Sequence, residues 1–314
     1  PSMSNVTHLE SPKLAVTLSN RGARLVQLLV KRQNLSLLLD TAQVSTDLID
    51  QFCVGGTVGP FAGRLRRVDA SNGQSAVSLH GGEAALHRAD WLLEHSSEPN
   101  VAIYTVSRRH GEGGLPGDRD FSVAYTLSDN SLVIDLSVTT THDTPISLTN
   151  HAYFTLGATS ASALSLQMNA KSVLLTDSEQ CATGRSMSVA GTPLDFARER
   201  LLGDALMAYP GGLDHSYVLA SGRRDVLVPD RVAALTNRAN GVSLDIATTH
   251  PCLQIYTASK LTSPLRPFTA ICLEAQGFPN GPNHALGRSE SWVAAGQTTK
   301  PRIVYRITEV SPTQ

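Results

Sequence analysis

The sequence has no excess of charge of either sign. Its 314 residues carry 26 Lys and Arg against 27 Asp and Glu, a formal net charge of −1. Proteins that bind nucleic acid or an anionic membrane usually present a basic field. The chain also has no apolar run near the roughly 20 residues that a membrane-spanning helix needs. We therefore expect neither a nucleic-acid partner nor membrane insertion.

Cysteine is scarce, and no Cys-x-x-Cys pair occurs. The four cysteines are scattered along the chain: Cys53, Cys181, Cys252 and Cys272. In a chain of this size, that pattern favours reduced thiols in the cytoplasm over a disulfide framework or a zinc site. Residues 1–5 show no charged segment followed by an apolar one, so we expect no signal peptide. The two residues before Met3 are a candidate cloning remnant.

Helical periodicity is also rare, and alternation of apolar and polar residues takes its place. A helical turn is expected at 47–52 and one short helix at 194–202. Strands are expected at 14–18, 24–30, 75–80, 101–107, 121–127, 132–140, 145–154, 163–168, 171–175, 242–247, 253–259 and 302–308. More than ten strands without a βα alternation predict one large all-β domain of packed antiparallel sheets over 1–314.

One carboxylate interrupts an apolar run late in the chain. Residues 269–284 begin as a strand pattern and end in glycines and prolines that cannot continue a regular element. Within the strand, Ile271, Leu273 and Ala275 would face one way, and Cys272 and Glu274 the other. Glu274 therefore either faces solvent at an edge or faces a partner in a cleft.

Other polar residues stand near strand ends in the same manner. His151 and Tyr153 share the polar face of 145–154, and the rest are Arg64, His80, Asp214 and Gln254. Each has an ordinary structural alternative, such as a hydrogen-bonded histidine or turn chemistry after Gly-Gly. Spacing in the sequence does not show whether these side chains converge.

A set of segments in a fixed order resembles the aldose 1-epimerases, or galactose mutarotases. They include Gly-x-x-x-Gly-Pro-Phe-Ala-Gly-Arg at 55–64, Leu-His-Gly-Gly at 79–82 with Trp91, Gly-Leu-Pro-Gly at 114–117, Leu-Thr-Asn-His-Ala-Tyr-Phe at 148–154, Gly-Thr-Pro-Leu-Asp-Phe at 191–196, Gly-Leu-Asp-His at 212–215, Leu-Gln-Ile-Tyr-Thr at 253–257 and Leu-Glu-Ala-Gln-Gly-Phe-Pro-Asn at 273–280. The resemblance implies a large antiparallel β-sandwich of the galactose mutarotase-like supersandwich type. It also implies a cytoplasmic sugar isomerase without cofactor or metal, as a monomer or homodimer.

Site roles follow from the same resemblance. It implies Glu274 as general base and His151 as general acid. The implied contacts to sugar hydroxyls are Arg64, His80, Tyr153, Asp214 and Gln254. The family usually has Asn before the arginine, where this chain has Gly63, which puts the preference among hexoses in doubt. His87, His215 and His284 are expected to be structural.

The residue types suit anomer interconversion on chemical grounds. The reaction removes the proton of the C1 hydroxyl and protonates the ring oxygen. The opened aldehyde then turns about C1–C2 and closes on its other face. A carboxylate can accept the first proton and an imidazole can supply the second near neutral pH.

Three other functions stay open at this point. A hexose-6-phosphate mutarotase would need cations for a dianion, with Arg66 and Arg67 as candidates. A glycoside hydrolase would pair Glu274 with Asp214. A non-catalytic sugar-binding module would need the hydroxyl contacts but no base at Glu274.

Overall fold

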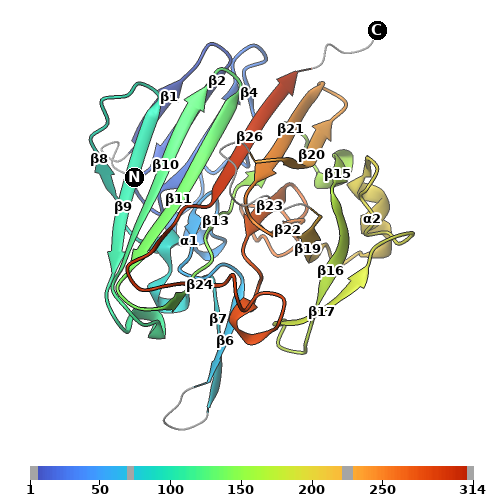
Figure 1. Cartoon of the computed structure of the whole chain (residues 1–314). Coiled ribbons are helices and arrows are strands. Elements are labelled where there is room, and N and C mark those ends of the chain that lie inside the picture. The colour runs from blue at the N-terminus through green and yellow to red at the C-terminus, as the bar shows by residue number, and fades with distance from the viewer. Residues whose placement is uncertain (1–5, 69–73, 221–228, 310–314) are drawn as a thin grey trace.

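The computed structural model describes residues 6–68, 74–220 and 229–309. The expectation for the residues before Met3 lies outside these ranges. Strands dominate the described chain, as expected, and they form two large sheets and several small ones (Figure 1). No helix of these ranges is long and apolar enough to cross a bilayer.

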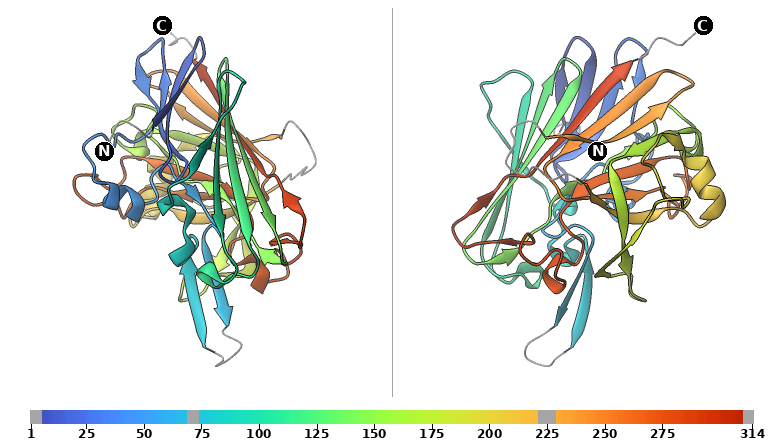
Figure 2. Two further views of the ribbon diagram at one scale, coloured as in Figure 1. Left: turned by 90° about the vertical axis from the view of Figure 1, so that its left-hand side faces the viewer. Right: turned by 45° about the vertical axis from the view of Figure 1, so that its right-hand side comes forward.

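The larger sheet has ten antiparallel strands. Its order is β18 (Arg200–Leu201), β15 (Ser165–Met168), β20 (Arg231–Asn237), β21 (Val242–Thr248), β26 (Arg302–Glu309), β11 (Ser131–Thr140), β10 (Arg119–Ser128), β9 (Val101–Arg108) and β8 (Leu92–Glu94), with β25 (Thr298–Thr299) pairing with β11. Its long strands stand side by side in both views of Figure 2. Alternation is strict in β10, where Phe121, Val123 and Tyr125 are buried.

The second large sheet has six strands and carries the pocket described below. Its order is β14 (Tyr153–Phe154), β23 (Ile271–Gln276), β22 (Cys252–Tyr256), β19 (Asp214–Leu219), β16 (Ala170–Thr176) and β17 (Ala182–Ser188). Leu253, Ile255 and Leu273 on one face of this sheet join the main apolar core. That core also holds residues of the ten-stranded sheet, from Ala102 to Ile307. The two sheets therefore share one core, and the other face of the six-stranded sheet carries polar groups together with two smaller apolar clusters.

The remaining elements are short or lie at the edges of these sheets. A four-stranded sheet is formed by β1 (Val6–Glu10), β2 (Leu14–Ser19), β3 (Arg24–Val30) and β4 (Leu35–Ser36). Three strand pairs are β6 (Arg64–Val68) with β7 (Ser75–Leu79), β5 (Thr57–Val58) with β13 (Thr149–Asn150), and β12 (Thr144–Pro145) with β24 (Trp292–Val293). The helices are α1 (Thr46–Gln51) and α2 (Leu202–Ala208), with 3₁₀ turns at Gly82–Ala84, Leu86–Arg88, Glu112–Gly114, Ala161–Ala163 and Gly281–Asn283. The β6–β7 pair projects from the body of the molecule (Figures 1 and 2).

The predicted helix over 194–202 is wrong. Leu194 and Phe196 are buried in the core, but the Asp195 carboxylate between them accepts hydrogen bonds from the backbone N–H groups of Gly191, at 3.2 Å, and Ala197, at 3.0 Å. Such local bonds stabilise turns in place of helix. The helix instead begins at Leu202, and the helical turn expected at 47–52 is confirmed as α1.

The strand expected over 145–154 is interrupted. Thr149–Asn150 pairs with β5, whereas Tyr153–Phe154 pairs with β23. Because the segment changes its partner between these two pairs, it forms short separate strands. His151 lies at the exchange point.

Candidate active site

A pocket of about 430 Å³ opens on the face of the six-stranded sheet that points away from the main apolar core. All seven residues singled out from the sequence line it, although they come from seven different strands and connections. They are Arg64, His80, His151, Tyr153, Asp214, Gln254 and Glu274. The structure therefore brings together side chains that spacing alone did not connect.

Strand pairing sets the positions on the pocket floor. Glu274 of β23 lies opposite Gln254 of β22, which lies opposite Ser216 of β19. Two residues before Glu274 on β23, Cys272 lies opposite Tyr256 of β22 and, on its other side, opposite Tyr153 of β14. Because side chains of a strand alternate between faces, Glu274 and Cys272 face away from the core that holds Leu273. The predicted facing of this strand is confirmed.

His151 is held by its backbone and by its ring. Its C=O accepts from Gly55 N–H at 2.8 Å, and its N–H donates to Gly56 O at 2.9 Å. Gly55 has φ 67°, and a Cβ there would stand 2.1 Å from Leu25 O, so the close approach requires glycine. The imidazole stacks on the Tyr153 ring, with centroids 5.2 Å apart. Its Nε2 atom ends 3.6 Å from Glu274 Oε1.

Burial shifts the pKa values of this pair in opposite directions. Only 3% of Glu274 is exposed, and the loss of hydration raises the pKa of its carboxyl well above the usual 4.5, with the charge of Asp214 adding to the effect. Loss of hydration also lowers the pKa of His151 to about 3. Both shifts favour the neutral forms. Burial therefore favours a proton on the carboxyl of Glu274 and an uncharged imidazole at His151.

The polar side chains around the pair are already oriented. Gln254 Nε2 donates to Asp214 Oδ1 at 2.7 Å, and Lys260 Nζ lies 3.8 Å from Asp214 Oδ2. Arg64 Nη2 donates to Gln180 Oε1 at 2.6 Å. These contacts present a carboxylate, an amide and a guanidinium to the pocket, which is the set that sugar hydroxyls require as donors and acceptors.

Tyr153 is fixed in the pocket at both its hydroxyl and its ring. Its hydroxyl donates to Phe52 O at 2.9 Å, so this proton is already used. The hydroxyl oxygen can still accept a bond from a ligand. The stacked ring nevertheless makes Tyr153 first of all a support for His151.

His80, His151 and Glu274 place one ligand atom each within 4.8 Å of one another, as a metal site would. His80 Nδ1, however, accepts the Gly63 N–H at 3.1 Å. A neutral ring with that acceptor carries its proton on Nε2, which then lacks the lone pair a metal needs. His80 is thus better suited to donate a hydrogen bond into the pocket than to bind a metal.

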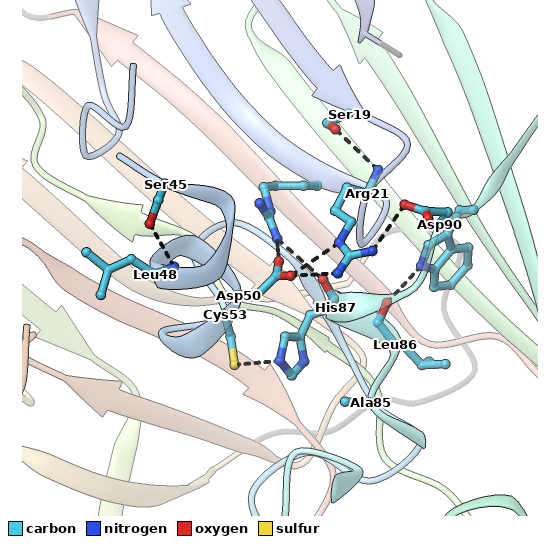
Figure 3. Close-up of polar contacts among 12 residues, drawn as sticks. Ser19, Arg21, Ser45, Leu48, Asp50, Cys53, Ala85, Leu86, His87 and Asp90 are labelled. Atoms are coloured by element: carbon cyan, nitrogen blue, oxygen red, sulfur yellow. Dashed lines mark hydrogen bonds and ion pairs between the residues drawn. The ribbon is translucent and has the colours of Figure 1, made fainter. Parts of the chain in front are cut away.

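A cluster of charged side chains lies at the end of α1, and Figure 3 shows its contacts. Asp50, near the end of α1, accepts from Arg24 Nη2 at 2.7 Å and from Arg21 Nη2 at 2.8 Å. Next to it, Cys53 Sγ lies 3.3 Å from His87 Nε2. Burial raises the pKa of the Cys53 thiol to about 12 and lowers that of His87 to about 4, so both are neutral. All four cysteines of the chain are buried, and none forms a disulfide.

Sequence reasoning missed several residues of the pocket. Gln276 lies two residues after Glu274 on the same face of β23, and the period of two could have found it. Lys260 and Gln180 come from connections that carry no such pattern. His215, expected to be structural, lines the pocket edge, where its Nδ1 accepts from Asp214 N–H at 3.1 Å. The structural role expected for His284 fits its Nε2 contact with Pro279 O at 2.9 Å.

Comparison with known proteins gives one consistent result. The sequence model of the aldose 1-epimerase family matches residues 5–306. The chain is 31% identical over 261 residues to an aldose 1-epimerase of Haemophilus influenzae, covering 74% of each chain. It is 28% identical over 299 residues to the galactose mutarotase of Mus musculus, covering 88% of this chain and 86% of the relative.

Solved structures agree with the sequence relatives. An aldose epimerase homologue from C. elegans superposes with a TM-score of 0.86 at 24% identity, over 98% of this chain and 99% of the other. A galactose 1-epimerase from Lactobacillus acidophilus gives 0.82 at 25% identity, over 97% and 94%. The antiparallel sandwich implied by the sequence motifs is therefore the fold of this chain.

Proposed function

The chain belongs to the aldose 1-epimerase family and is an isomerase, and on this premise we propose that it interconverts the α and β anomers of free aldohexoses such as galactose and glucose. The observation that carries the proposal is the buried pair of Glu274 and His151. The reactive atoms of this pair lie 3.6 Å apart in a pocket lined with hydroxyl-binding groups. We assign Glu274 as general base and His151 as general acid.

The proposed reaction begins with the sugar ring closed, Glu274 ionised and His151 protonated. The carboxylate takes the proton of the C1 hydroxyl while the C1–O5 bond breaks, and Nε2 of His151 protonates O5. The aldehyde turns about C1–C2, and the same two protons return as the ring closes on the other face of C1. Atoms and charges balance over the cycle, so the enzyme regains its starting state.

The pKa shifts have a direct consequence in this cycle. After ring opening Glu274 is a neutral acid and His151 a neutral imidazole, and burial favours both of these forms. The pocket thus stabilises the protonation state that accompanies the open aldehyde. A general acid or base of this kind contributes roughly 10²–10⁴-fold in rate.

The alternatives fit the pocket less well. Arg66, a candidate for a 6-phosphate, is held by Asp177 at 2.8 Å and Glu179 at 2.6 Å. A hydrolase would employ Asp214 as second carboxylate, but Asp214 is bonded to Gln254 at 2.7 Å. A binding module would have no use for a carboxyl kept next to an imidazole at the cost of hydration.

Three further assignments belong to the proposal. We propose a cytoplasmic enzyme that works as a monomer or homodimer, and the cytoplasmic location is in keeping with four cysteines that form no disulfide. Its chain is proposed to be one domain, because a single apolar core contains residues from Leu9 to Ile307.

Polarimetry tests the function directly. Freshly dissolved α-galactose, α-glucose and their 6-phosphates are followed with and without enzyme, and the spontaneous rate is subtracted. We expect acceleration for the free sugars and little for the phosphates. A preference for the phosphates would replace the proposed substrate class, and no acceleration of any sugar would leave only binding.

A further inference from the structure

One buried amide in the pocket has no partner in the proposed mechanism. Gln276 is 1% exposed and lines the pocket. Neither Oε1 nor Nε2 of its side chain has a hydrogen-bond partner among the described residues. Buried polar atoms are nearly always bonded, and an unbonded one opposes folding. An amide kept in this condition is suited to a ligand that supplies both a donor and an acceptor.

The position of Gln276 on β23 indicates which part of a sugar it meets. Gln276 follows Glu274 by two positions on the same face of the strand, which corresponds to a rise of about 7 Å. A pyranose with its C1 hydroxyl on Glu274 would therefore turn the opposite edge of its ring, with the C3 and C4 hydroxyls, toward Gln276. An amide can donate to one of two neighbouring hydroxyls and accept from the other.

No side chain stands beside this amide at position 63, because that residue is glycine. A Cβ at Gly63 would stand 3.7 Å from Gln276 Nε2 and 3.6 Å from Pro279 Cβ, which is ordinary contact. Gly63 has φ 74°, a conformation in which asparagine is enriched over most other residues. Position 63 could therefore hold a side chain, and in this protein it adds none to the pocket wall beside Gln276.

On the basis of the proposed function, we propose that Gln276 is a specificity-determining residue that binds the C3–C4 hydroxyl edge of the sugar, with Gly63 leaving room for that contact. It takes no part in the proton transfers, which stay with Glu274 and His151. Epimers at C4, such as galactose and glucose, place one of these hydroxyls differently and so meet the amide differently.

The test compares Gln276→Leu with the wild type on galactose, glucose and 4-deoxyglucose. Loss of two neutral hydrogen bonds is expected to raise KM for galactose and glucose roughly 10- to 100-fold, with kcat nearly unchanged. For 4-deoxyglucose the increase should be clearly smaller, since one of the two bonds is missing in both enzymes. Gly63→Asn, which fills the gap, should change the galactose to glucose ratio of kcat/KM.

A second readout separates binding from a structural role. Removing an unbonded buried amide should leave the Tm of the free Gln276→Leu protein equal to the wild type or higher, while galactose raises the Tm less than before. A lowered Tm with kcat and KM disturbed alike for all three sugars would instead make Gln276 structural. Unchanged KM values would also overturn the proposal, whereas a wild type without activity on any sugar would refute the proposed function itself.

Discussion

At the scale of single residues, the proposed reaction depends most on the carboxyl of Glu274. Replacing it with Gln keeps its size and one oxygen acceptor but removes the basicity that the C1 hydroxyl proton needs. We expect Glu274→Gln to lower kcat at least roughly 10²-fold while the Kd for galactose, from titration calorimetry, changes far less. Cys272→Ala, on the same strand face, is the matched control. A Glu274→Gln enzyme of near-normal kcat would move the search for the base to Asp214.

The guanidinium of Arg64 should act on binding more than on chemistry. It carries a permanent charge and a fork of donors, one of which already meets Gln180. Losing its charge-assisted bonds in Arg64→Ala should cost about 1.5–3 kcal/mol, seen mainly as a higher KM in polarimetry. Arg66→Ala serves as control, because its side chain is engaged by Asp177 and Glu179. Equal effects of the two substitutions would remove Arg64 from the sugar site.

The acid–base pair predicts a pH profile that one substitution should invert. With one shared proton required, kcat/KM should fall in acid when His151, of pKa about 3, gains the second proton. It should fall in alkali when Glu274, of raised pKa, loses the last one. In His151→Asn the residual rate should instead rise as Glu274 ionises, because the base then needs no protonated partner. A flat wild-type profile between pH 3 and 10, or equal profiles for both enzymes, would contradict the assignment.

At the scale of elements, α1 supports His151, the proposed general acid, indirectly. Asp50 near its end bonds two arginines, and Gly55 and Gly56 just beyond it hold the backbone of His151. Breaking a buried pair leaves an uncompensated charge, so Asp50→Asn should lower the free energy of unfolding by about 3–5 kcal/mol in urea titration. We also expect a lower kcat from displacement of His151.

The opposite end of the same helix offers the control. Ser45 caps α1 by accepting from Leu48 N–H at 3.3 Å (Figure 3). Ser45→Ala should cost only about 1 kcal/mol and leave kcat unchanged. If both variants lose the same stability, the buried ion pairs do not anchor the helix.

Elements also show what the sequence could predict. The two faces of β23 followed from alternation alone, and the family motifs pointed to all seven residues that line the pocket. The turn at 194–202 did not follow, because Asp195 bonds its local backbone in a segment whose apolar spacing resembles a helix. The interruption before Tyr153 depends on a change of strand partner, which is a tertiary event.

At the scale of the whole molecule, buried histidines should make the fold sensitive to acid. Burial lowers the pKa values of four histidines, so the unfolded chain binds more protons than the native one below about pH 6.5; they are His80, His87, His151 and His215. Glu274 acts in the opposite sense, since its raised pKa costs stability as pH rises above 4.5. Because four imidazoles act against one carboxyl, Tm should rise from pH 4.5 to 6.5.

Calorimetry over this range provides the check. His87→Asn should reduce the pH dependence of Tm, because one imidazole that takes up a proton on unfolding is gone. A Tm that is constant or falls from pH 4.5 to 6.5 would show that these histidines are not held neutral by the fold.

The two roles of β23, in the core and in the pocket, also limit which mutations the protein can accept in evolution. One face of the strand helps to fill the core, and the other faces the sugar pocket. A point substitution alters one face only, so sugar preference can be adjusted while folding is preserved. Inserting or deleting a single residue would exchange the two faces from that point onward. Folding and catalysis would then be lost in one step, so substrate range can diversify here by residue identity but not by strand length.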